Sequence, residues 1–121
     1  MTDMRMLLIA FLALPAAADP AEVVGASATP GADGWRFDVT LRHGDTGWDD
    51  YADGWRVEAA DGTVLATREL LHPHVTEQPF TRSLGGVVLP EGTREVWIAA
   101  STNVGGWEGE RLRVELGEEV R

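Results

Sequence analysis

Hydrophobic and polar residues alternate most clearly between residues 35 and 42. Every second residue there is aromatic or aliphatic: Trp35, Phe37, Val39 and Leu41. Because successive side chains of an extended chain point to opposite faces, this period of two predicts a half-buried β-strand. Shorter or weaker patterns of the same kind predict further strands at residues 21–29, 55–59, 63–70, 82–89, 95–101 and 112–116. The sequence therefore predicts an all-β fold, a seven-stranded antiparallel sandwich of two sheets.

The connections between these strands differ in length and chemistry. Three are short turns rich in Gly, Pro and Asp, at residues 30–34, 61–62 and 90–94. Three are longer and carry most of the unusual side chains, at residues 42–54, 71–81 and 102–109. Since consecutive antiparallel strands place alternate connections at opposite ends, we expect the three long connections to share one end of the sandwich. Binding residues are usually found on such loops.

Two tryptophans and one turn carry a family resemblance. Trp35 on the second predicted strand, Trp55 on the third, and the Leu89-Pro90-Glu91-Gly92 turn resemble the immunoglobulin-like and fibronectin-type-III-like sandwiches. The chain lacks the paired cysteines of antibody domains, and no tyrosine precedes the sixth strand. It also resembles small exported proteins of proteobacteria. The resemblance implies an architecture and no particular activity.

The first eighteen residues have the pattern of a signal peptide. Arg5 precedes an uninterrupted apolar run at residues 6–14, and residues 15–18 end in small side chains. The run is too short to span a bilayer, so we expect cleavage before Asp19 and a single sandwich domain at residues 19–121. The alternative is an N-terminal anchor that is retained. Either case predicts export, to the periplasm or beyond the cell.

Composition narrows the chemistry that the domain can perform. The chain contains no cysteine, which excludes disulfides, zinc–thiolate sites and thiol nucleophiles. Its formal net charge is −10, and the signal segment removes one Asp and one Arg together. Such an excess of negative charge disfavours nucleic acids and anionic membranes as partners and favours cations or basic proteins.

The segment from His72 to Phe80 holds two of the three histidines. Prolines at 73 and 79 prevent it from continuing a central strand. In an extended His-x-His sequence both rings lie on one side, roughly 6–7 Å apart at the Cα atoms, and can reach one ion. One interpretation is therefore a Cu(II) or Zn(II) site, with these candidate ligands: His43, His72, His74, Asp45 and Glu77. The alternative is that the histidines tether the loops by hydrogen bonds, or pack on a tryptophan.

An acidic stretch at residues 45–54 allows two interpretations. Its clustered carboxylates offer the oxygen ligands that Ca²⁺ prefers, but their spacing does not match an EF-hand. The favoured interpretation is that the aspartates accept backbone N–H bonds in turns.

Aromatic and acidic side chains in the predicted loops indicate a surface for a partner. The candidate partner-binding residues are Trp48, Asp49, Asp50, Tyr51 and Trp107. They could stack against a side chain of a partner protein or, less favourably, a sugar ring. Alternatively, Trp48 and Trp107 fold back as lids over the open end of the sandwich.

Catalytic motifs are missing from the sequence. No glycine-flanked nucleophilic serine, phosphate-binding glycine loop or His-Glu-x-x-His motif is present. We therefore predict an exported, non-enzymatic binding domain, which holds a divalent transition metal through loop histidines. The alternative is a protein-interaction or accessory module that uses its acidic and aromatic loops.

Overall fold

The computed structural model describes residues 19–121, so the predicted signal peptide at residues 1–18 lies outside the described part of the chain. Within the described range the chain forms seven strands and no helix. The strands are β1 (Glu22–Gly31), β2 (Gly34–Arg42), β3 (Ala52–Glu58), β4 (Val64–Glu69), β5 (Phe80–Val87), β6 (Glu95–Thr102) and β7 (Leu112–Glu115). The prediction of seven strands is confirmed.

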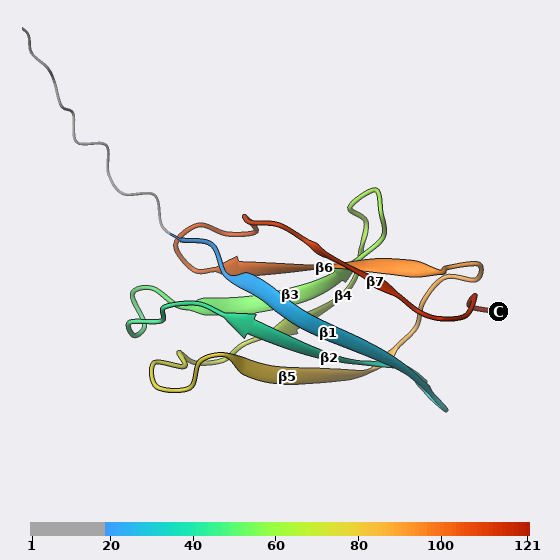
Figure 1. Ribbon diagram of the computed structural model, residues 1–121, viewed down its shortest axis with the longest axis horizontal. Helices are drawn as coiled ribbons and strands as arrows, with labels where there is room; N and C mark the ends of the chain where they lie inside the picture. Colours follow the sequence, from blue (N-terminus) through green and yellow to red (C-terminus); the bar gives the residue numbers. More distant parts are fainter. Residues whose placement is uncertain (1–18) are drawn as a thin grey trace, which may run out of the picture.

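The strands are arranged in two antiparallel sheets (Figure 1). One sheet has three strands in the order β1-β2-β5, and the other has four in the order β4-β3-β6-β7. The predicted all-β, two-sheet architecture is therefore confirmed. Strand β3 begins at Ala52, three residues before the predicted start at Trp55, and pairs with β6 from its first residue.

The inward residues of both sheets form one hydrophobic core. Strand β2 buries every second residue, as its alternation predicts, and its inward row faces the inward rows of β3 and β6. Trp35 and Trp55 are both buried in this core, as expected. The core includes, from these three strands, Trp35, Phe37, Val39, Leu41, Ala52, Trp55, Val57, Val96, Ile98 and Ala100.

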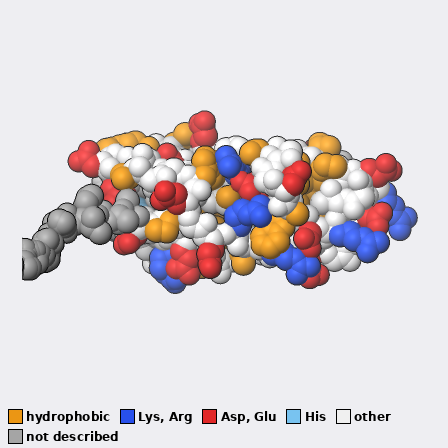
Figure 2. Space-filling model, turned by 90° about the horizontal axis from the view of Figure 1, so that it is seen from above, with side chains coloured by type: hydrophobic (Ala, Val, Ile, Leu, Met, Phe, Trp, Pro, Cys, Tyr) orange, Lys and Arg blue, Asp and Glu red, His pale blue; other side chains and the backbone are white. Residues whose placement is uncertain are grey.

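The outer faces carry paired charges. Figure 2 shows acidic and basic side chains intermingled along the face that it displays. Some ion pairs link neighbouring positions on one strand or on adjacent strands, as in Arg36–Asp38 and Arg113–Glu95. Exposed pairs of this kind contribute little to stability, about 0–1 kcal/mol each.

Candidate functional site

Three long loops meet at one end of the sandwich, the end at which the described chain enters β1 (Figure 1). We call this end the loop pole. It consists of the β2–β3 loop at residues 43–51, the β4–β5 loop at residues 70–79 and the β6–β7 loop at residues 103–111. The short turns lie at the other end, so the arrangement expected from alternating strand direction is observed.

Asp45 is the centre of a buried hydrogen-bond network in the loop pole. Its side chain is fully buried. The Oδ1 atom accepts from His43 Nδ1 at 2.7 Å and from the Ala52 backbone N–H at 3.0 Å. The Oδ2 atom accepts from the His74 backbone N–H at 2.8 Å. One carboxylate thus joins the β2–β3 loop to the β4–β5 loop.

His43 extends this network to the start of the described chain. Its Nε2 atom lies 3.0 Å from the Asp19 backbone oxygen, while Nδ1 faces Asp45. Both neighbours are acceptors, so both bonds form together only when the ring carries two protons. The Asp50 Oδ1 atom, which is buried and has no hydrogen-bond partner among the described residues, lies 3.7 Å from Nε2.

Two amide side chains form further hydrogen bonds between the loops. Gln78 accepts from the His43 backbone N–H at 2.9 Å and donates to the His74 backbone oxygen at 3.0 Å. Asn103 accepts from the Tyr51 backbone N–H at 2.8 Å and donates to the Trp48 backbone oxygen at 3.0 Å. The β2–β3 loop is therefore tied to both of the other loops.

The candidate metal ligands do not gather at one point. The rings of His72 and His74 are neighbours, with centroids 4.7 Å apart, but His43 and Asp45 belong to the buried network. Within residues 19–121, no group of three or more His, Asp or Glu side chains is placed to hold a metal ion. The Nε2 atom of His74 faces the Arg82 guanidinium at 2.8 Å, and Glu77 also accepts from Arg82, at 3.2 Å.

His74 is packed inside the fold. Its ring stacks on Phe80, with centroids 3.9 Å apart and planes 10° apart, so its aromatic neighbour is a phenylalanine rather than the expected tryptophan. Burial, followed by the nearby charges of Arg82 and His72, lowers the pKa of His74 from its ordinary value of 6.5. The ring is therefore neutral at pH 7.

The acidic stretch at residues 45–54 serves mainly as a hydrogen-bond acceptor. Asp45 accepts from two backbone N–H groups, and the Asp53 carboxylate in β3 accepts from the Ser101 hydroxyl of β6. The two backbone bonds of Asp45 favour the hydrogen-bonding interpretation of the aspartates over calcium binding. Asp49 is exposed and forms no ion pair with a described residue.

The loop tryptophans are exposed and do not close the end of the sandwich. Trp48 meets Tyr51 edge to face, at 5.5 Å between ring centroids, and leaves most of its surface in solvent. Trp107 lies on the outer face of β3, where the Arg56 guanidinium stacks 4.0 Å from its ring centroid. A Cβ atom at Gly54 would come within 3.5 Å of the same ring. The lid interpretation therefore does not describe Trp48.

Sequence reasoning missed three aliphatic members of the loop pole. Leu71, Val75 and Val104 are exposed on the same loops as Trp48 and Trp107. It also assigned no role to Arg68 and Arg82, which flank His74 in space. The one signal for the aliphatic residues was their position in segments that prolines and glycines exclude from strands.

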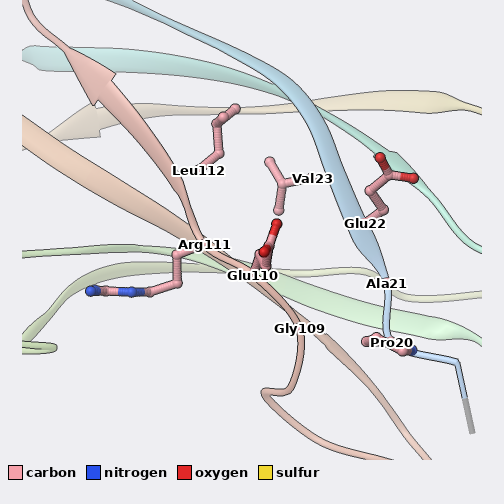
Figure 3. Close-up of a pocket in the computed structure, with 8 residues that line it drawn as sticks. All are labelled: Pro20, Ala21, Glu22, Val23, Gly109, Glu110, Arg111 and Leu112. Atoms are coloured by element: carbon pink, nitrogen blue, oxygen red, sulfur yellow. The ribbon is translucent and has the colours of Figure 1, made fainter.

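A separate hollow of about 290 Å³ lies between the start of β1 and the segment that enters β7 (Figure 3). Its apolar lining includes Val23 and Leu112, and its carboxylates are those of Glu22 and Glu110. Arg111, the one basic residue in its lining, points away from β1 and donates to Glu58 at 3.0 Å. The hollow presents no converging set of polar groups.

Comparisons with known proteins give one curated relative. The chain is 46% identical, over 79 residues, to a protein of Halomicrobium mukohataei named "Putative lipoprotein". The match covers 65% of this chain but 38% of that protein, so the chain spans well under half of its relative's length. No family model matches the chain, and no solved structure matches it significantly. In the described part of the chain, no helix is long and apolar enough to cross a membrane.

Proposed function

We propose that this chain provides an exported, cell-envelope binding module, which contacts a partner protein through the loop pole. Export is supported by the signal-peptide pattern at residues 1–18 and by the lipoprotein name of the relative. We assign the sandwich to the fibronectin-type-III-like kind. In antibody constant domains the fourth strand joins the sheet of the first, whereas here β4 pairs with β3 in the other sheet.

The distribution of exposed apolar side chains carries the proposal. Five of the seven large hydrophobic residues that are exposed in the described chain lie on the three loops of the pole. Their exposed fractions are 72% for Leu71, 65% for Trp48, 54% for Val75 and Val104, and 40% for Trp107. Exposed apolar side chains that gather in one region of a protein surface are typical of interaction sites, whereas scattered ones are not.

The rigidity of the loops also favours a binding role. The bonds of Asp45, Gln78 and Asn103 hold the loops in one arrangement before any partner arrives. Preorganised loops lose little conformational entropy on binding, which raises affinity. The negative charge of the domain indicates the kind of partner. Exposed Asp49 and the net charge of −10 favour a basic protein.

Substitution of Trp48 by alanine is expected to weaken partner binding by about 2 kcal/mol, or roughly 30-fold, because tryptophan is enriched among the hot spots of protein interfaces. The fold should be retained, since the ring is mostly in solvent. A photo-crosslinking amino acid at position 71, introduced into the protein in its native cell envelope, should capture the partner. The adduct should be lost when Trp48→Ala is added.

Position 88 provides the matched control for this experiment. Val88 is 78% exposed but belongs to the β5–β6 connection, at the opposite end of the sandwich. The same probe there should give no adduct. Equal capture from positions 71 and 88, or capture that is indifferent to Trp48→Ala, would contradict a partner surface at the loop pole.

A metal-binding function has less support, because the five candidate ligands do not converge on one point. His43 bonds to Asp45, the His72 ring lies beside the His74 ring, and the Arg82 guanidinium contacts His74. We therefore expect no stoichiometric response when Cu(II) or Zn(II) is titrated to micromolar concentrations, with tryptophan fluorescence as the readout. A saturable response that disappears in the His72→Ala/His74→Ala variant would instead establish the metal function.

A further inference from the structure

A small cavity of about 100 Å³ lies where β4 passes into the β4–β5 loop. It is lined by two guanidinium groups, two imidazoles and two leucines, from Arg68, Arg82, His72, His74, Leu70 and Leu71. We propose that this cavity binds a small oxyanion of the carboxylate or phosphate type. The site does not require the partner-binding function of the loop pole, although Leu71 belongs to both surfaces.

The charge of the lining contrasts with that of the whole chain. The chain has 20 acidic and 10 basic residues, yet no carboxylate lines this cavity and two arginines do. Arg68 is fixed in place by a bond from its Nε atom to the Ser83 backbone oxygen of β5, at 2.9 Å. At physiological ionic strength charges are screened beyond about 8 Å. The two guanidinium groups of the lining favour an anion, and the carboxylate that contacts one of them, Glu77, is the nearest competitor.

His74 adds a hydrogen-bond donor that lacks an acceptor. A guanidinium group can only donate, so the contact of Arg82 with His74 at 2.8 Å makes Nε2 the acceptor. In the neutral ring the proton then resides on Nδ1. That atom is buried and has no hydrogen-bond partner among the described residues. A buried donor without a partner is unfavourable, and a bound acceptor that reached this atom would remove the cost.

Glu77 shows how an anion would be held. Its Oε1 atom already accepts from Arg82 at 3.2 Å, while the side chain is more than half exposed. Such a loosely held carboxylate competes with a ligand for the same guanidinium group. Removing its charge should therefore strengthen anion binding, an effect that a purely structural role of Arg82 would not produce.

The cavity is small, at about 100 Å³. A carboxylate or a phosphate group is small enough to enter such a space. The larger hollow of Figure 3 has no comparable chemistry, because its one arginine is turned toward Glu58.

The test is an NMR titration of the folded domain with sodium acetate and, separately, sodium phosphate, at pH 7 and constant ionic strength set with sodium chloride. Saturable shifts of the backbone amides around His74 and Arg82 are expected with at least one of the two anions. Saturation by acetate alone identifies a carboxylate site, and saturation by phosphate alone identifies a phosphate site.

Variants distinguish anion binding in the cavity from a general effect of the protein's charge. Arg82→Gln and Arg68→Gln should each weaken binding about tenfold or more, as expected for loss of a charge-assisted hydrogen bond. Glu77→Gln should strengthen it several-fold. Arg94→Gln is the matched control, since Arg94 is exposed at the opposite end of the sandwich and pairs with Glu119, and it should leave affinity within twofold.

Three results would overturn the proposal. They are shifts that stay linear with both anions, a loss in Arg94→Gln equal to that in Arg82→Gln, and no gain in Glu77→Gln. A dispersed amide spectrum establishes that each variant is folded. If Arg82→Gln fails this criterion, Arg68→Gln and Glu77→Gln decide the outcome.

Discussion

Replacing Asp45 with alanine is expected to lower the free energy of unfolding by about 3–5 kcal/mol, because the change removes one partner from a buried charge network. The carboxylate is fully buried and accepts three hydrogen bonds, from His43 Nδ1 and from the backbone N–H groups of Ala52 and His74. Alanine leaves all three donors inside the fold without an acceptor. Domains of this size are stable by about 5–15 kcal/mol, so the variant should be close to unfolding.

Asp45→Asn removes the charge of the side chain but keeps its approximate shape. The amide keeps one acceptor oxygen but turns an NH₂ group toward a donor, since N–H groups face both carboxylate oxygens. We expect a loss of about 2–3 kcal/mol, between wild type and the alanine variant. The measurement is equilibrium unfolding in urea, followed by tryptophan fluorescence.

Asp49→Asn is the control for this series, because Asp49 lies on the same loop but is exposed. Its effect should stay within about 0.5 kcal/mol, as is usual for surface substitutions. A loss in Asp45→Asn no larger than that of Asp49→Asn would show that the network does not stabilise the fold. It would also remove the basis for treating the loop pole as preorganised.

The strand pattern and the shared end of the long loops could both be predicted from the sequence, for a simple physical reason. Alternation reports which face of a strand is buried, and strand direction alone decides the end at which a connection lies. The same reasoning places the start of β3 three residues too late, because a glycine such as Gly54 is typical of a loop. In the structure Gly54 is paired in β3, where a Cβ atom would lie 3.3 Å from the Ser101 hydroxyl and 3.4 Å from the Arg68 backbone oxygen.

The roles of the histidines could not be predicted, because they depend on side-chain direction rather than on position. His43 and His74 belong to loops that do meet, but the Asp45 carboxylate lies between them, bonded to the ring of one and the backbone of the other. Arg82 follows His74 by eight residues, and the turn of the chain into β5 brings its guanidinium group onto the His74 ring. Neither contact can be predicted from the spacing of these residues along the sequence.

Trp55→Ala is the second substitution with a large expected effect, about 3–5 kcal/mol of destabilisation, because it leaves a cavity in the core. Trp55 is the largest of the fully buried side chains and is 0% exposed. Strand β3 lies between β4 and β6, so the surrounding backbone is held on both sides and cannot collapse into the space. The variant should unfold at a much lower urea concentration than wild type.

Trp55→Phe should be far milder, at about 1 kcal/mol or less, because two terms of opposite sign offset each other. The smaller ring loses part of the buried apolar surface. However, the Trp55 Nε1 atom is buried and has no hydrogen-bond partner among the described residues, so phenylalanine also removes an unsatisfied donor, worth about 1–3 kcal/mol. Urea unfolding of both variants, followed by far-ultraviolet circular dichroism, measures the difference. A loss in Trp55→Phe well above about 1 kcal/mol would show that the indole N–H carries no such cost, because the loss of packing would then have nothing to offset it.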